Sequence, residues 1–142
     1  MFSTMLVEDN RNFRQALKFA LRDQFPSMNF IGAGSGEEAI ERVHSHSVDF
    51  IFMDIDLPGL NGLKATQKIR ADYQNIPIAI LTGHDSPENR KAAIEGGANC
   101  LVDKNALKLE ELFTVVNCFQ NAKQNGRKPI CVRGSSGFDW KN

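Results

Sequence analysis

The 142-residue sequence has no long hydrophobic run and no excess of charge of one sign. No stretch approaches the ~18 consecutive apolar residues of a membrane-spanning helix, and residues 1–7 are too short and uncharged for a signal peptide. Lys and Arg total 17, and Asp and Glu also total 17. No global charge therefore attracts the chain to nucleic acid or to an anionic membrane. We expect it to bind neither nucleic acid nor a membrane directly.

Cysteine is scarce, with only Cys100, Cys118 and Cys131 in the chain. Their number is odd, and none has another Cys or a His at the spacing of a zinc site. This argues against a disulfide framework and against structural zinc. Since a reducing compartment suits such thiols, we expect a cytoplasmic protein.

The residues that are abundant fit one folded domain. Hydrophobic residues make up 42% and charged residues 24% of the chain, which are ordinary proportions for a globular protein. Compact domains hold ~100 to 150 residues around a single core. Beyond residue 124, glycines and Pro129 interrupt any sustained period. We predict a domain over residues 1–123 and a tail or truncated linker over residues 124–142.

Short apolar segments alternate with segments of helical period. The apolar segments predict strands at residues 4–7, 28–33, 50–53, 76–81 and 100–102. Capping signals at Ser35, Asn61 and Ser86 predict the starts of three helices. Strands that alternate with helices pair in parallel through right-handed crossovers. The pattern therefore predicts an α/β fold, a doubly wound five-stranded parallel sheet with helices on both faces.

Two further helices are predicted from apolar periodicity alone. One carries a stripe formed by Phe13, Ala16, Leu17, Ala20 and Leu21. The other spans about residues 107–122 and should turn its apolar side chains inward. Its inward residues are Leu112, Val115, Val116 and Phe119.

Acidic, hydroxyl and amine side chains follow four of the predicted strands. They are Glu8 and Asp9 after the first strand, Asp54 and Asp56 after the third, Thr82 after the fourth and Lys104 after the fifth. In an open parallel sheet, ligands bind beyond the carboxyl ends of the strands. We therefore expect these side chains to form one site.

The chemistry of this set favours phosphoryl transfer to a carboxylate. Two carboxylates ~4 Å apart repel by ~4 kcal/mol at an effective dielectric of ~20, and Mg²⁺ offsets such repulsion while accepting oxygen ligands. Lys104 supplies a second positive charge, and Thr82 supplies a hydrogen-bond donor. Asp54 could then attack phosphorus while Mg²⁺ and Lys104 neutralise the developing charge.

In order and spacing these residues resemble the receiver domain of bacterial response regulators. The similarity rests on Glu8-Asp9, the segment 53–62, Leu81-Thr82-Gly83, Gly97-Ala98 and Lys104, and it extends from residue 1 to about residue 123. It implies a flavodoxin-like, receiver-type fold. It also implies that a sensor histidine kinase or a phosphotransfer protein donates a phosphoryl group to Asp54.

The resemblance also implies the role of each site residue. Asp9 and Asp54 would bind Mg²⁺, Glu8 would assist through water, and the backbone carbonyl of Asp56 would complete the protein ligands. Thr82 matches the switch hydroxyl and Lys104 the phosphate-binding lysine. The chain would then be a switch for an unnamed downstream target or an absent output domain. Phosphorylation-dependent homodimerisation through the fourth and fifth helices is a further implication.

Two positions depart from the common family pattern. Leu101 stands where the family usually has an aromatic residue, and Asn105 follows Lys104 where proline is common. Receivers attached to helix-turn-helix output domains often lack that proline, so the chain faintly resembles them.

Two alternative functions follow from the sequence. Leu101 is compatible with a pseudo-receiver, a protein-binding module that works without phosphorylation. Asp54-Ile55-Asp56 also resembles the nucleophile pair of haloacid-dehalogenase-type phosphatases, although such enzymes place the pair after the first strand. We expect the chain to have no enzymatic activity other than self-phosphorylation from a donor and slow autodephosphorylation.

Overall fold

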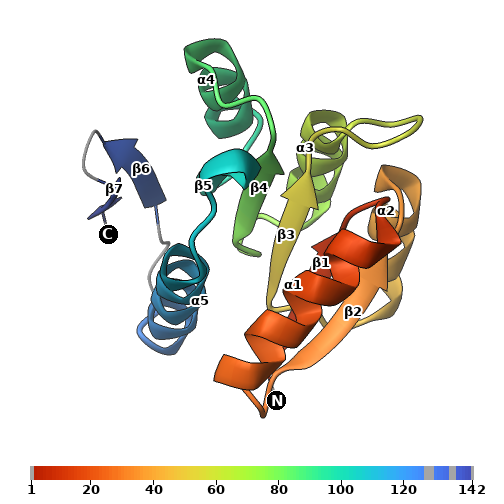
Figure 1. The fold of residues 1–142 in the computed structure, drawn as a ribbon. Coiled ribbons are helices and arrows are strands. Elements are labelled where there is room, and N and C mark those ends of the chain that lie inside the picture. The colour runs from red at the N-terminus through yellow and green to blue at the C-terminus, as the bar shows by residue number, and fades with distance from the viewer. Residues whose placement is uncertain (1, 127–129, 135–136, 142) are drawn as a thin grey trace.

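The computed structural model describes residues 2–126, 130–134 and 137–141. Its strands are β1 (Ser3–Val7), β2 (Asn29–Ala33), β3 (Phe50–Asp54), β4 (Ile78–Thr82), β5 (Cys100–Asp103), β6 (Ile130–Gly134) and β7 (Gly137–Lys141). Its helices are α1 (Arg11–Gln24), α2 (Gly36–Ser45), α3 (Gly62–Asp72), α4 (Pro87–Glu95) and α5 (Leu109–Gln124), with a short 3₁₀ turn, η1, at Lys104–Ala106. Figure 1 shows their arrangement.

The first five strands form one parallel sheet in the order β2-β1-β3-β4-β5. The strand order reverses beside β1, so β1 and β3 are direct neighbours although α1, β2 and α2 separate them in sequence. This is the doubly wound α/β fold expected from the alternation of elements. Its consequence is that the chain segments following β1 and β3 emerge side by side.

Two hydrophobic cores cover the two faces of the sheet. Residues from α2, α3 and α4, such as Val43, Ile69 and Ala93, pack on one face. Residues from α1 and α5, such as Leu21 and Phe119, pack on the other, and Figure 1 shows this division of the helices. Successive strand residues alternate between the two cores, which is the period of two that a sheet imposes.

Side-chain caps begin the three helices for which the sequence predicted them. The N-cap side chains of Ser35, Asn61 and Ser86 each accept a backbone N–H three residues on, at 2.9 to 3.1 Å. Glu38 stands three residues after Ser35, as the acid of a capping box does, but its Oε2 accepts the N–H of Gly34 at 3.1 Å rather than that of Ser35. The local signals therefore fixed the helix starts correctly.

The two helices predicted from periodicity show smaller differences. In α1, Leu17 and Leu21 are buried, but Ala16 is exposed, so the predicted stripe was too wide. The last helix begins at Leu109, because residues 104–106 form the 3₁₀ turn η1. Its inward residues are those predicted: Leu112, Val115, Val116 and Phe119.

The chain beyond residue 124, where the sequence shows no sustained period, contains two short strands. Strands β6 and β7 pair antiparallel as a separate two-stranded sheet, and β6 lies beside β5. Short strands around glycines give too little periodicity to be recognised from sequence.

The cysteines require one correction. Cys118 is a free, partly buried thiol, whereas Cys100 is disulfide-bonded, contrary to the expectation of unpaired cysteines. The cysteine content therefore does not support a reducing compartment. Among the described residues, no helix is long and apolar enough to span a membrane.

Candidate acidic site at the carboxyl edge of the sheet

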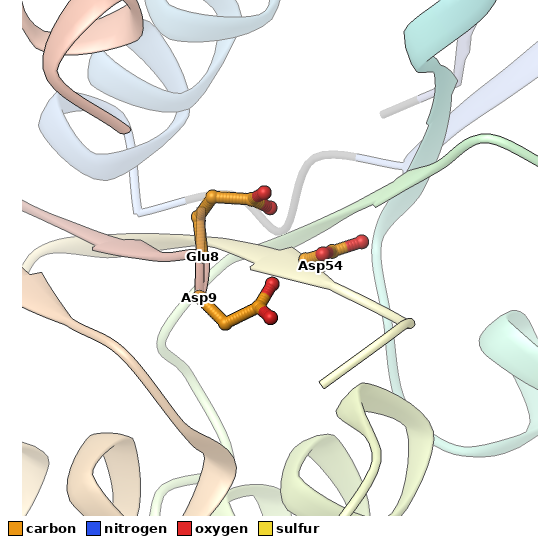
Figure 2. Close-up of side chains that lie close together, drawn as sticks. All are labelled: Glu8, Asp9 and Asp54. Carbon is orange, nitrogen blue, oxygen red and sulfur yellow. The ribbon is translucent and has the colours of Figure 1, made fainter. Parts of the chain in front are cut away.

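Three carboxylates converge where β1 and β3 end. Val7 and Met53 are partners in the β1–β3 pairing, so Glu8 and Asp54 follow at the same level of the sheet. One oxygen from each of Glu8, Asp9 and Asp54 lies within 4.8 Å of the others. Figure 2 shows the three carboxylate groups gathered in one space. Glu8 and Asp54 are only 3% and 2% exposed, whereas Asp9 is exposed.

Lys104 brings the opposite charge to these buried acids. It is the first residue after β5, and its Nζ lies 2.9 Å from Glu8 Oε2 and 3.4 Å from Asp54 Oδ2. Burial lowers the pKa of Lys104, but hydrogen bonds and charge interactions with Glu8 and Asp54 more than offset this and raise it. The ammonium group of Lys104 is therefore fixed by contacts with Glu8 and Asp54 and is not a solvated surface charge.

One ammonium does not balance the site. Burial, with the nearby Glu8 carboxylate, raises the pKa of Asp54 to about 7, against the lowering effects of Lys104 and of the Asp56 N–H. Three carboxyl groups beside the one ammonium of Lys104 leave an excess of acidic groups in a poorly solvated place. Oxygen ligands close together with excess negative charge suit a hard divalent cation such as Mg²⁺. The residues present therefore fit such an ion.

The loop after β3 is held close to Asp54. The backbone N–H of Asp56 donates to Asp54 Oδ1 at 3.2 Å, and the Asp56 side chain is exposed. The start of α3 packs so tightly on this strand end that a Cβ at Gly62 would lie 1.9 Å from the carbonyl oxygen of Asp54. The Asp56 carboxylate is outside the three-acid cluster, which gives no support to its acid–base role in the phosphatase alternative.

Thr82 ends β4, next to β3. It lies one residue beyond Leu81, the partner of Asp54 in the sheet, and it is fully buried. Its Oγ1 accepts the backbone N–H of His84 at 2.9 Å. The loops after β4 and β5 are joined, because Asn105 Nδ2 donates to the carbonyl of Gly83 at 2.7 Å. Proline at this position has no side-chain N–H and could not donate this hydrogen bond.

Helix α1 contributes two neighbours that the sequence argument missed. The ring of Phe13 lies beneath Lys104, with Nζ 4.5 Å from the ring centroid. The Arg14 guanidinium donates to the backbone carbonyl of Glu8. Their position one helical turn beyond Glu8-Asp9 was visible in the sequence, but the direction of their side chains was not.

Comparisons with known proteins agree with this arrangement. Residues 4–117 match the response regulator receiver domain family. The chain is 32% identical over 105 residues to the CAI-1 autoinducer sensor kinase/phosphatase CqsS of Vibrio cholerae, covering 72% of this chain and 15% of that protein. It is 32% identical over 109 residues to the response regulator MprA of Mycolicibacterium vanbaalenii, covering 77% of this chain and 46% of that protein. The chain thus spans less than half the length of either relative.

A solved structure extends the likeness to three dimensions. The response regulator TrrA of Thermotoga maritima, in complex with Mg²⁺-BeF, superposes with a TM-score of 0.75 at 28% identity, covering 84% of this chain and 99% of that one. The fold, the acidic cluster and the family match agree. The chain belongs to the response regulator receiver domain family of two-component systems.

Proposed function

We propose that Asp54 is the residue that accepts a phosphoryl group, in a Mg²⁺-dependent reaction with a sensor histidine kinase or a phosphotransfer protein as donor. The observation that carries this assignment is the buried Asp54 carboxylate beside both an acid pair and the Lys104 ammonium. The alternative nucleophiles Glu8 and Asp9 lie in the same cluster, and the carboxylate of Asp54 accepts the backbone N–H of Asp56 at 3.2 Å. This bond orients Asp54 for attack.

The residues around Asp54 can hold the metal that this reaction requires. Asp9 and Asp54 would ligate Mg²⁺ directly, Glu8 through water, and Asp56 through its backbone carbonyl. The bound ion would neutralise charge on the phosphoryl oxygens. The TrrA structure supports the assignment, since it contains Mg²⁺ with the phosphoryl analogue BeF.

The chain's own side chains account for the remaining steps. An Asp54 carboxylate oxygen forms a bond to phosphorus as the bond from phosphorus to the donor nitrogen breaks. Lys104 lies 3.4 Å from Asp54 and can turn to the new phosphoryl oxygens. The Thr82 hydroxyl accepts from His84 N–H, so its own proton stays available for donation to a phosphoryl oxygen.

Phosphorylation would then shift the population between two arrangements of the loops after β3 and β4. Movement of Thr82 would be transmitted to the loop after β5 through the bond between Asn105 and Gly83. The surface that changes would comprise α4, β5 and α5. Phosphorylation-dependent pairing of two chains through α4 and α5 belongs to this proposal.

The proposal also covers the activity of the chain, its location and the extent of its folded domain. The chain would catalyse no reaction beyond self-phosphorylation from a donor and slow autodephosphorylation. On the family match rather than on its cysteines, it would act in the cytoplasm on a downstream partner or output domain, without contacting nucleic acid or membrane itself. We place the domain at residues 1–123, with residues 124–142 as a tail or linker.

Beryllofluoride, which mimics a phosphoryl group on a carboxylate, tests the switch. With Mg²⁺ present, the amide signals of the loops containing Asp56, Gly83 and Asn105 should shift, and they should not shift in Asp54→Asn. Asp72→Asn, a change at an exposed acid far from the cluster, is the matched control and should respond like the parent. Unchanged spectra in the parent would reject the proposal.

The pseudo-receiver alternative has one observation in its favour. Leu101 is only 3% exposed and packs in the core with α4, so the usual aromatic group is replaced by a fixed core residue. A pseudo-receiver would bind its partner equally with and without beryllofluoride. Equal affinity in the two states would support it over the switch.

A further inference from the structure

Among the described residues, Lys104 Nζ contacts side chains from three separate segments of the chain. Two are carboxylates, Glu8 Oε2 at 2.9 Å and Asp54 Oδ2 at 3.4 Å. The third is the ring of Phe13, whose centroid lies 4.5 Å from Nζ. The Lys104 side chain is only 19% exposed, so the ring stands where water would otherwise solvate the ammonium.

These contacts differ in what happens to them during the reaction. A divalent cation bound at the acidic cluster would compete with Lys104 for Glu8, and phosphorylation would turn one carboxylate oxygen of Asp54 into the oxygen bonded to phosphorus. The Phe13 ring ligates no metal and takes no phosphoryl group. It is therefore the contact that stays with Lys104 when the two acids are engaged elsewhere.

Local structure fixes the ring in this place. The side chain of Asn10, the N-cap of α1, accepts the backbone N–H of Phe13 at 3.1 Å. One residue further, Arg14 donates to the carbonyl of Glu8. These two hydrogen bonds fix the first turn of α1 around Phe13. The Phe13 ring packs against the core formed by α1 and α5.

We propose that Phe13 is a positioning residue for phosphoryl transfer, holding the Lys104 ammonium over its ring and directed at Asp54. This inference rests on the proposed function of Asp54. A cation–π contact to a partly desolvated ammonium is strong enough to change a rate by roughly fivefold. This role is distinct from core packing, because the Phe13 ring would affect the reaction by fixing the position of the Lys104 ammonium.

Variants of Phe13 separate positioning from packing. Phe13→Leu keeps an apolar side chain and removes the ring, while Phe13→Tyr keeps the ring. Phe25→Leu is the matched control, because Phe25 is also a partly buried aromatic of the α1–α5 core, and no described cation lies over its ring. The first readout is the ε-methylene NMR signal of Lys104, which the Phe13 ring current should displace in the parent and in Phe13→Tyr but not in Phe13→Leu.

The second readout is the initial rate of Asp54 labelling by acetyl phosphate at saturating Mg²⁺. We expect Phe13→Leu to slow labelling roughly fivefold, with Phe13→Tyr and Phe25→Leu close to the parent. In a Lys104→Met background, Phe13→Leu should have no further effect. An equal slowing by Phe25→Leu, or an undiminished effect of Phe13→Leu without Lys104, would overturn the positioning role.

Failure of this inference is distinguishable from failure of the proposed function. If the parent is labelled and Phe13→Leu is labelled at the same rate, only the role of Phe13 is rejected. If the parent is not labelled at all, the assignment of Asp54 itself fails.

Discussion

At the scale of single residues, the site combines side chains that are costly to bury with the groups that compensate them. Glu8 and Asp54 are almost fully buried, and Lys104 contacts both. Removing one partner of such a group leaves an uncompensated buried charge. Thr82 is different, because it is buried but uncharged and its oxygen already accepts the His84 N–H. Its substitution should therefore change signalling without collapsing the charged cluster.

Thr82→Ala tests the separation between phosphorylation and switching. It removes the hydroxyl that would donate to the phosphoryl group but leaves Asp54 and Lys104 in place. We expect labelling by acetyl phosphate to change less than about threefold, while beryllofluoride-induced amide shifts in the loop after β5 fall by at least about half, the loss of one hydrogen bond being worth about 1 kcal/mol. Thr82→Ser, which keeps the hydroxyl, should behave like the parent. Equal loss of labelling and shifts would contradict the separate roles.

The sequence predicted the acidic residues and Lys104 because each directly follows a strand, and strand ends meet at one sheet edge. It did not predict the Phe13 ring beneath Lys104 or the Arg14 bond to Glu8. Both depend on how α1 is rotated over the sheet, which periodicity describes only coarsely. The exposed position of Ala16, expected to be part of the apolar stripe, comes from the same uncertainty in rotation.

At the scale of elements, the close approach of α3 to β3 determines the geometry of the loop that follows Asp54. Helix α3 begins at Gly62, whose backbone N–H donates to the carbonyl of Ile55 at 2.9 Å. The absence of a side chain at Gly62 lets the helix start touch the carbonyl of Asp54. A larger residue must push the loop and the strand end apart.

Gly62→Ala should therefore destabilise the fold and disturb the site. The added Cβ would lie 1.9 Å from the Asp54 carbonyl oxygen, and strain of this kind costs at least about 2 kcal/mol. Gly34→Ala is the control, since its Cβ would meet its nearest neighbours at 3.7 and 3.8 Å. Urea unfolding measures both. A Gly62→Ala variant as stable as Gly34→Ala would show that the contact is not tight in solution.

Helices α2 and α3 are linked by His44, which is a pH-sensitive contact. Its Nδ1 faces the Ile40 carbonyl at 2.7 Å and its Nε2 faces Asp72 Oδ2 at 3.1 Å. The Ile40 bond, and less strongly Asp72, raise the pKa of His44 despite the opposing effect of desolvation. Both ring nitrogens donate only in the protonated imidazole.

A raised pKa in the folded state means that the link stabilises the protein below the unfolded pKa of ~6.5 and is lost as pH rises through the folded value. NMR titration of the His44 ring should give a pKa above ~6.5, and Asp72→Asn should lower it. The stability difference between parent and Asp72→Asn should shrink from about pH 6 to about pH 8. A His44 pKa at or below that of an unfolded peptide would contradict the link.

Elements were predicted best where short-range signals define them. The caps at Ser35, Asn61 and Ser86 depend on residues three positions apart, so the sequence reveals them. The start of α5 was placed two residues early because the 3₁₀ turn η1 precedes it. A 3₁₀ turn of three residues is too short to show a recognisable period of apolar residues in the sequence.

At the scale of the whole molecule, the fold places the acidic cluster and Lys104 at one edge of the sheet, and the α4–β5–α5 side is the output surface that we propose. The parallel sheet followed from the alternation of apolar segments with helical ones. The hairpin of β6 and β7 did not, because two short strands around glycines leave only a weak pattern. The chain spans 15% and 46% of the CqsS and MprA relatives, so their other activities are not attributed to it.

The central claim is that Asp54 is the phosphorylated residue, and intact-mass spectrometry after incubation with acetyl phosphate tests it most directly. With Mg²⁺, the parent should gain the mass of one phosphoryl group, and this gain should be absent when the metal is chelated and in Asp54→Asn. Asp56→Asn, which changes the neighbouring exposed acid, should still be labelled. Labelling that persists at the same level in Asp54→Asn, or a parent that gains no mass with Mg²⁺ present, would contradict the account.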